Sequence, residues 1–248
     1  MPEGDTIHRA ANRLRAVLAG ERLVRLEIRR TPARNPPAGT VITDVDAVGK
    51  HLLIEFADGH VLRSHMRMTG SWHVYRVGER WRKPAHLARA VIEVEAWTAV
   101  CFAAPVVELE RTRASASRVA HLGPDLTKPD IGDADIERGV ERMPPGEVGS
   151  VLLDQRVAAG IGNIFKSETL FVCGVNPFTD TSALDRASKQ KLLATASKLL
   201  RSSVAGASRP TNVYGRAGQP CKRCGTPIRS QPQGEQQRVT YWCPSCQT

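Results

Sequence analysis

The sequence predicts an α+β protein of two domains, strand-rich in the first and helical in the second, with a metal-binding β-hairpin at its end. At 248 residues, the chain is long enough for two domains that each bury a core. Apolar and polar side chains alternate over residues 24–29, as they do in a half-buried strand, and further strand-like segments follow up to residue 110. Residues 151–200 instead carry apolar side chains at helical spacing. Near the end stand two close cysteine pairs, Cys221 with Cys224 and Cys243 with Cys246.

The composition is that of a globular protein with an anionic partner. Hydrophobic residues make up 41% of the chain and charged residues 24%, which excludes a disordered chain. The net charge of +10 favours nucleic acid first and an anionic membrane surface second. No apolar stretch is long enough to span a bilayer, and the acidic start, Glu3 and Asp5, is not that of a signal peptide. We therefore expect a cytoplasmic protein.

The first residues, Met1-Pro2-Glu3, form a candidate reaction site. If Met1 is removed, Pro2 carries a secondary amine, and an α-amino group with a pKa near ~8 is partly neutral and nucleophilic at physiological pH. The carboxyl of Glu3 beside it can donate a proton to a leaving group. The alternative is an ordinary chain start with no chemical role. A helix capped by Asp5 or Thr6 and ended by Gly20 is expected to fix the orientation of the pair.

Strands are expected after this helix, arranged as a two-layer sandwich that carries the helix. Asp58-Gly59 predicts a hairpin turn, and a Pro- and Gly-rich loop is expected over residues 31–40. Lys50, at a turn after Gly49, is either a surface charge or a phosphate ligand. The strand segments are 24–28, 41–48, 51–56, 61–66, 87–95 and 99–110.

The loop that contains Arg67, Met68 and Thr69 offers a candidate wedge. A flexible apolar side chain such as that of Met68 can insert into a base stack, although methionine is also a common core filler.

The second half begins after a linker expected over residues 111–120. A helix over 151–159, a glycine turn and a second helix capped by Asn163 would leave free backbone N–H groups for a phosphate. An ordinary helical hairpin is the alternative. A further helix is expected from Ser182 to Leu200.

The cysteine spacing predicts one structural Zn²⁺. The two pairs enclose eighteen residues, which is typical of a four-thiolate zinc ribbon, and four thiolates leave no coordination position open for catalysis. Disulfides are the alternative, at roughly one in ten without a secretion signal. The segment from Asn212 onward contains five basic residues and one acid, so it is cationic. The hairpin can therefore hold Arg238 against phosphates. The ligands are Cys221, Cys224, Cys243 and Cys246.

Five motifs in one order, spread from Pro2 to Cys246, resemble the formamidopyrimidine-DNA glycosylase and endonuclease VIII family of base-excision repair enzymes. The resemblance implies a catalytic β-sandwich domain (residues 1–113), a helix-two-turn-helix DNA-binding domain (121–206) and a zinc-finger hairpin (212–248). The motifs are Pro2-Glu3-Gly4, Gly49-Lys50-His51-Leu52-Leu53, Gly160-Ile161-Gly162-Asn163, Val213-Tyr214-Gly215-Arg216 and the four cysteines.

The same resemblance implies the residue roles. Pro2 is the Schiff-base nucleophile, Glu3 the proton donor, and Lys50 the lysine that binds phosphate and assists β-elimination. Asn163 and Arg238 bind DNA phosphates, and Arg238 is also associated with δ-elimination. Met68 fills the gap left by the flipped base, flanked by Arg67 and Thr69. The expected partner is damaged double-stranded DNA, bound by a monomer.

Two features favour the endonuclease VIII branch, which prefers oxidised pyrimidines. The stretch 102–107 lacks the Arg-Arg-Phe wedge common in the formamidopyrimidine branch, and only residues 202–212 are available for the loop that caps oxidised guanine. Asp5-Thr6 stands where the family often has Pro-Glu, so the second acid is shifted or missing. The alternatives are an oxidised-purine glycosylase of the same fold and a non-catalytic, zinc-dependent protein that binds damaged DNA.

Overall fold

The computed structural model describes residues 2–29 and 35–248. The chain divides into two compact units, Met1–His121 and Leu122–Thr248. Met1 and residues 31–34 of the expected loop lie outside the described residues. In the part of the chain that is described, no helix has both the length and the apolar character of a membrane span.

The first unit begins with α1 (Gly4–Leu18), which buries the apolar face predicted from the sequence. The predicted cap is wrong: the N-cap is Glu3, whose carbonyl oxygen accepts the N–H groups of Thr6 at 3.0 Å and Ile7 at 3.1 Å. The helix therefore starts before Asp5. The Asp5 carboxylate forms an ion pair with Arg9, one turn further along the helix. This early start brings the beginning of the helix directly onto the candidate reaction site.

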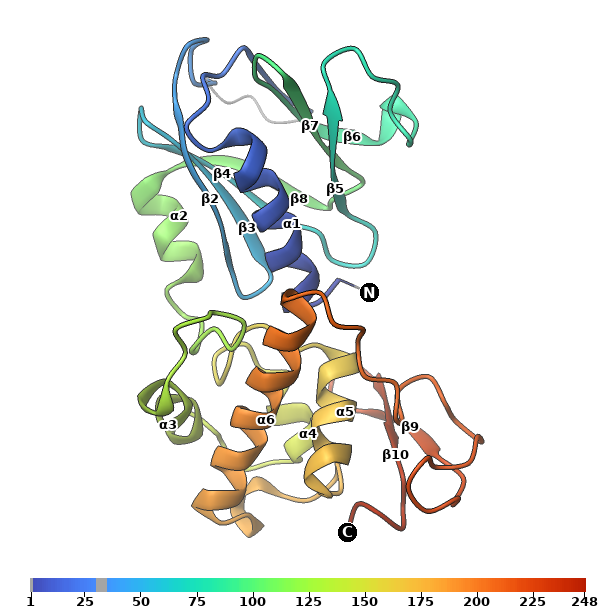
Figure 1. Ribbon diagram of the computed structural model, residues 1–248. Helices are drawn as coiled ribbons and strands as arrows, with labels where there is room; N and C mark the ends of the chain where they lie inside the picture. Colours follow the sequence, from blue (N-terminus) through green and yellow to red (C-terminus); the bar gives the residue numbers. More distant parts are fainter. Residues whose placement is uncertain (1, 30–34) are drawn as a thin grey trace. The chain divides into compact units, whose positions relative to one another are not determined.

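Two antiparallel four-stranded sheets complete the unit, as the predicted sandwich requires (Figure 1). Their strand orders are β1-β6-β7-β5 and β2-β3-β4-β8. Apolar side chains of both sheets and of α1 share one core. The strands are β1 (Arg25–Ile28), β2 (Ile42–Val48), β3 (His51–Phe56), β4 (His60–His65), β5 (Ser71–Arg76), β6 (Ala88–Glu93), β7 (Trp97–Phe102) and β8 (Val106–Arg111), with a short 3-10 turn, η1 (Ala85–Leu87).

Two details of the sheets differ from the expectation. The segment 99–110 is not one strand but two, β7 and β8, because Ala103 adopts a left-handed φ of 50° that no strand can contain. Strand β5 was not predicted, although Trp72 and Val74 alternate with Ser71 and His73. The segment expected to link the two halves is helical: α2 (Thr112–Val119) buries only Ser115 and therefore carries little apolar signal.

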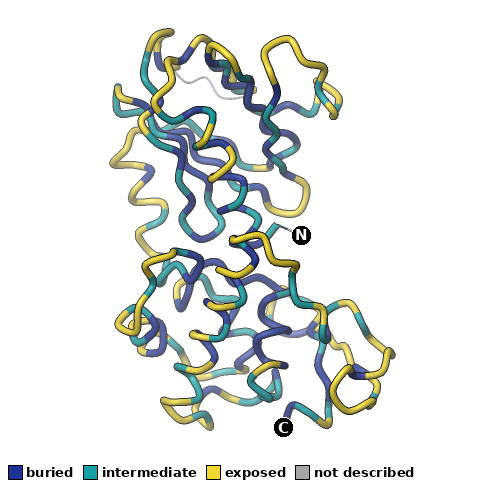
Figure 2. The backbone as a smooth tube through the Cα atoms, viewed as in Figure 1, coloured by how far each residue is buried: buried dark blue, intermediate teal, exposed yellow. Residues whose placement is uncertain are grey.

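The second unit is helical, with a two-stranded hairpin at its end. Helix α5 packs against α6. Buried apolar residues from α3, α4, α5 and α6 form the main core of this unit (Figure 2). The elements are α3 (Asp133–Glu141), α4 (Val148–Val151), α5 (Asn163–Cys173), the 3-10 turn η2 (Thr181–Ala183), α6 (Arg186–Val204), β9 (Arg229–Gln233) and β10 (Arg238–Trp242).

The predicted helix over 151–159 is wrong. Helix α4 ends at Val151, and turns follow up to Gly162. Side chains compete with helical hydrogen bonds here, since Gln155 binds the carbonyl oxygens of Leu153 and Ile161 at 2.8 and 3.0 Å. Gly162 caps α5, and Asn163 is its first residue and not its cap.

The last long helix also starts later than expected. Helix α6 begins at Arg186 with Asp185 as its cap, whose carboxylate accepts the N–H of Ser188 at 2.7 Å. Ser182, the predicted start, lies in η2.

Candidate functional site

The start of α1 holds two buried acids, only one of which stands next to Pro2. Glu3 is 1% exposed and Asp5 is fully buried. Asp5 accepts hydrogen bonds from Arg9 at 3.2 Å and from the hydroxyl of Thr6 at 3.3 Å. Pro2 is half-buried. Glu3 is the buried acid that follows Pro2 directly in the chain.

Lys50 stands in a tight two-residue turn between β2 and β3. Gly49 supplies the left-handed φ of 58° that the turn requires, and Val48 pairs with His51 across it. The turn lies at the end of the unit where α1 begins (Figure 1), and α1 packs along β2. A short turn of this kind holds the lysine ammonium on a rigid base.

Two histidines next to this turn were not identified from the sequence. The rings of His51 and His65 meet edge to face with centroids 4.9 Å apart. Burial lowers the pKa of His51 to about 3 and the pKa of His65 to about 4, and the charge of Lys50 adds to the effect on His65. The backbone N–H of Arg67 donates to Nδ1 of His65 at 3.2 Å. His65 is thus neutral with its proton on Nε2, a donor suited to a phosphate oxygen.

The candidate wedge is an ordered turn with Met68 at its surface. Met68 is 61% exposed, whereas Met66 is 2% exposed and belongs to the core. Arg67 adopts a left-handed φ of 45°, and the hydroxyl of Thr69 donates to the carbonyl of Ala103 at 2.8 Å. Thr69 therefore holds the loop in place through Ala103, and Met68 alone presents an apolar tip.

In the second unit, Asn163 ties the start of α5 to the hairpin. Its Nδ2 donates to the backbone carbonyl of Val239 in β10 at 2.7 Å. The side chain is 6% exposed, and its Oδ1 is buried without a hydrogen-bond partner among residues 2–29 and 35–248. An amide nitrogen carries a second hydrogen, so the predicted phosphate contact and the hairpin contact are compatible.

A buried polar chain fixes the same hairpin one turn further along α5. Lys166 is fully buried, and its Nζ donates to Oγ1 of Thr240 at 2.6 Å. Thr240 donates in turn to Oε1 of Gln233 at 2.7 Å, which joins the two strands. Arg238, the first residue of β10, lies two residues before Thr240, and its Nε donates to Gln236 at 3.3 Å. Its guanidinium therefore projects from a strand anchored on α5.

Glu168, also on α5, organises the segment that contains Val213 and Tyr214. The carboxylate is fully buried and accepts four hydrogen bonds of 2.9 Å each, from the backbone N–H groups of Asn212, Val213 and Tyr214 and from the Asn212 side chain. Neither Glu168 nor Lys166 was identified from the sequence. Both are charged residues within an otherwise apolar helical segment, and this pattern in the sequence could have indicated them.

Replacing Glu168 by glutamine is expected to destabilise the protein by about 3 kcal/mol, because the new NH₂ faces N–H donors and leaves them unsatisfied. Thermal unfolding measures the loss. Glu235→Gln, at an exposed position of the hairpin turn, is the matched control and should leave the melting temperature unchanged. Equal melting temperatures for the two variants would contradict the anchoring role of Glu168.

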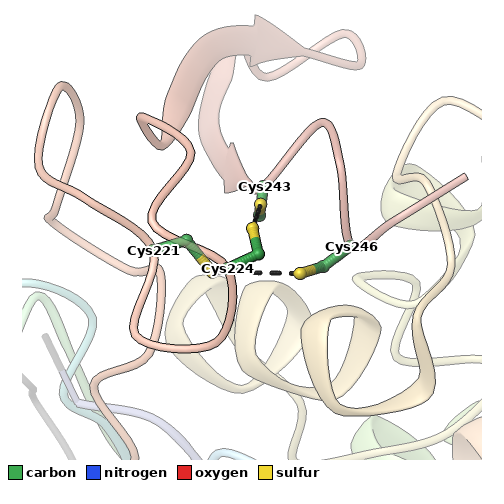
Figure 3. A group of neighbouring side chains, drawn as sticks. All are labelled: Cys221, Cys224, Cys243 and Cys246. Atoms are coloured by element: carbon green, nitrogen blue, oxygen red, sulfur yellow. Dashed lines mark hydrogen bonds between the residues drawn. The ribbon is translucent and has the colours of Figure 1, made fainter.

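The four tail cysteines converge, as the zinc prediction requires (Figure 3). All four sulfur atoms lie within 4.8 Å of one another, with Cys221 Sγ 4.0 Å from Cys246 Sγ and Cys224 Sγ 3.4 Å from Cys243 Sγ. Tetrahedral thiolates around zinc are separated by about 3.8 Å, given Zn–S bonds of about 2.3 Å. The residues present fit one Zn²⁺, which is structural because four sulfurs fill its coordination.

Comparison with known families finds three matches along the chain. The formamidopyrimidine-DNA glycosylase N-terminal domain matches residues 1–105, the formamidopyrimidine-DNA glycosylase H2TH domain matches 122–213, and the zinc finger found in FPG and IleRS matches 218–248.

Individual relatives match over the whole chain. A probable endonuclease 8 2 of Streptomyces coelicolor is 42% identical and is covered over 94% of its length. The DNA-(apurinic or apyrimidinic site) lyase Nei2 of Mycolicibacterium smegmatis is 37% identical and 99% covered. Among solved structures, Lactococcus lactis Fpg bound to DNA containing an oxidised pyrimidine superposes with a TM-score of 0.84 at 22% identity, both chains fully covered. This last likeness concerns the fold.

Proposed function

Because the chain belongs to the formamidopyrimidine-DNA glycosylase and endonuclease VIII family, we propose that it excises oxidised pyrimidines from duplex DNA and cleaves the strand by β,δ-elimination. Its activity is that of a DNA glycosylase and AP lyase. The single observation that supports the proposed chemistry is that Glu3, the residue after Pro2, is buried at the N-cap of α1.

The proposed reaction begins at the Pro2 nitrogen, which removal of Met1 would expose. The amine attacks C1′ of the damaged nucleotide, the bond to the base breaks, and Glu3 supplies the proton that the departing base needs. The C1′–O4′ bond then breaks and O4′ takes a proton, which opens the sugar ring and leaves an iminium ion between Pro2 and C1′. The iminium ion is the electron sink that lets a proton leave C2′, so that the 3′ phosphate is eliminated, and a second elimination releases the 5′ phosphate.

The cationic side chains are proposed to hold the backbone while the damaged nucleotide leaves the stack. Lys50 and the Nε2–H of His65 stand together in the first unit, and Asn163 and Arg238 are joined through β10 in the second. Extrusion of a nucleotide costs a few kcal/mol, which phosphate contacts offset. Met68, exposed on its loop, fills the space that the base vacates.

We propose that the chain has three functional domains: a catalytic domain over residues 1–113, a DNA-binding helical domain over 121–206 and a zinc hairpin over 212–248. The enzyme is proposed to act as a monomer on the DNA of the nucleoid, in the cytoplasm.

Pyrimidine preference is supported by the short segment 202–212, which leaves little chain to cap an oxidised guanine, and is tested with a lesion panel. We expect single-turnover excision of thymine glycol to be at least about tenfold faster than excision of 8-oxoguanine opposite cytosine, a margin within the reach of pocket discrimination. A duplex with a preformed abasic site should be cut equally in both sequence contexts. Rapid cutting at 8-oxoguanine, with none at thymine glycol, would assign the protein to the oxidised-purine branch.

A further inference from the structure

A groove of about 560 Å³ lies between α1 and the free edge of β5 in the first unit. β5 is the end strand of its sheet, so among the described residues no strand pairs with its outer edge, and α1 contacts β5 (Figure 1). Arg13 in its wall follows Glu3 by ten residues, which places the groove about 15 Å along the helix from the reaction site. Its walls include Ala10, Leu14, Val17, Val74 and Trp97.

The groove is cationic and has no internal counter-charge. None of the described residues that line the groove is acidic, whereas two of them, Arg13 and Arg82, are basic. The other arginines of α1 are neutralised, Arg9 by Asp5 and Arg15 by Asp44 and Asp46. Arg13 and Arg82 have no carboxylate within 4.0 Å in the described ranges 2–29 and 35–248. Two exposed arginines that line one groove give it an electrostatic preference for an anion.

A chain of hydrogen bonds along the groove ends in a hydroxyl donor. The backbone N–H of Arg82 donates to the Tyr75 hydroxyl at 3.1 Å, which meets Nδ1 of His73 at 2.9 Å. Nε2 of His73 meets Oγ of Ser71 at 3.1 Å, and Nζ of Lys83 donates to the same oxygen at 2.9 Å. The pKa of His73 is lowered by burial and by the neighbouring cations, which keeps its ring neutral.

One polar hydrogen of the Tyr75–His73–Ser71 hydrogen-bond series is not used within it. Tyr75, neutral His73 and Ser71 own one polar hydrogen each, and only two contacts join them, so one hydrogen remains. Tyr75 is 1% exposed, and an unused donor there would be buried at a cost. The favoured arrangement places the unused hydrogen on Ser71, which lines the groove. Ser71, Arg13 and Arg82 thus offer hydrogen-bond donors to the groove.

We propose that this groove binds a nucleoside phosphate, with the phosphate held by Arg13, Arg82 and Ser71 and the nucleoside over the apolar wall. A phosphate supplies only acceptors and negative charge, which complements a site made of donors. The partly exposed side chains of Val17, Val74 and Trp97 provide an apolar surface for a base, although the Arg76 guanidinium, 3.8 Å from the Trp97 ring centroid, covers one face of that ring. Duplex DNA keeps its bases stacked and would leave that surface uncovered, so a free nucleotide fits better. This site is separate from the proposed catalytic function.

Calorimetric titration of the zinc-loaded full chain with deoxyadenosine monophosphate tests the proposal. A duplex carrying a tetrahydrofuran abasic-site analogue is present in excess, so that the lesion-binding surface is occupied. We expect saturable binding with one nucleotide per chain, and binding at least about tenfold weaker for deoxyadenosine, which lacks the charged acceptors. Inorganic phosphate should compete for the same site.

The variants Arg13→Gln and Arg82→Gln are each expected to weaken nucleotide binding by about tenfold, and Ser71→Ala by several-fold. Arg80→Gln is the matched control, since Arg80 is exposed in the same segment as Arg82 but does not line the groove. Lack of saturable binding, equal binding by Arg13→Gln and Arg80→Gln, or displacement of the nucleotide by excess duplex would each overturn the proposal. None of these results bears on strand scission, which is assayed separately.

Discussion

Replacing Pro2 by glycine is expected to lower the rate of strand scission at a preformed abasic site by about a hundredfold. Glycine retains an amine but loses the ring that fixes the nitrogen against the start of α1, and misplacing a reacting atom by about 1 Å costs roughly a hundredfold. DNA affinity should stay near that of the unchanged protein, because the proposed phosphate ligands are elsewhere. Single-turnover scission and a binding titration on the same duplex measure both quantities.

Glu3→Gln is the companion variant, since it changes the acid and leaves the amine. It should lose about a hundredfold or more in base excision, the usual contribution of a general acid. Scission of preformed abasic DNA should survive largely intact. Full lyase activity in Pro2→Gly would place the nucleophile elsewhere, with Lys50 the first residue to examine.

Replacing Cys221 by serine is expected to release the zinc and loosen the hairpin that carries Arg238. Cys221 is 4% exposed and packs with Phe171, Val213, Ile228 and Cys243, so loss of the metal also opens this small core. Metal binding and local folding are coupled in such sites. Metal content should fall from one zinc per chain to nearly none, and the salt dependence of DNA binding should weaken by about one phosphate contact.

Cys173→Ser provides the control for this change. Cys173 lies outside the cluster, on α5, where its sulfur meets the hydroxyl of Thr195 at 3.4 Å. The control should keep its zinc and its DNA affinity. Unchanged DNA binding and scission products in a zinc-free Cys221→Ser protein would show that the ribbon is dispensable.

The elements that the sequence predicts well are those whose signal is local. The apolar periodicity of α1 and the apolar residues of β2, β3 and β4 are each signals within one element, and the cysteine spacing identifies the zinc site without any fold. The predicted helix boundaries were wrong at two places. Gln155 ends the expected helix over 151–159 by binding nearby carbonyl oxygens, and the extended backbone of Glu3 starts α1 earlier than expected.

The supporting residues could not be predicted because their partners are distant in the sequence. Lys166 reaches Thr240, 74 residues away, and Glu168 binds the backbone of Val213, 45 residues away. The ring of His65 meets that of His51 only when the sheet has formed. Resemblance supplied the roles expected of Pro2 and Arg238, whereas packing contacts such as these are specific to the folded chain.

Borohydride reduction of the protein mixed with abasic-site DNA, followed by intact-mass analysis, tests the central claim most directly. The account predicts one covalent adduct per chain, mapped to the peptide that starts at Pro2, in protein whose Met1 has been removed. Strand scission by protein that retains Met1, or an adduct on any other residue, would contradict it.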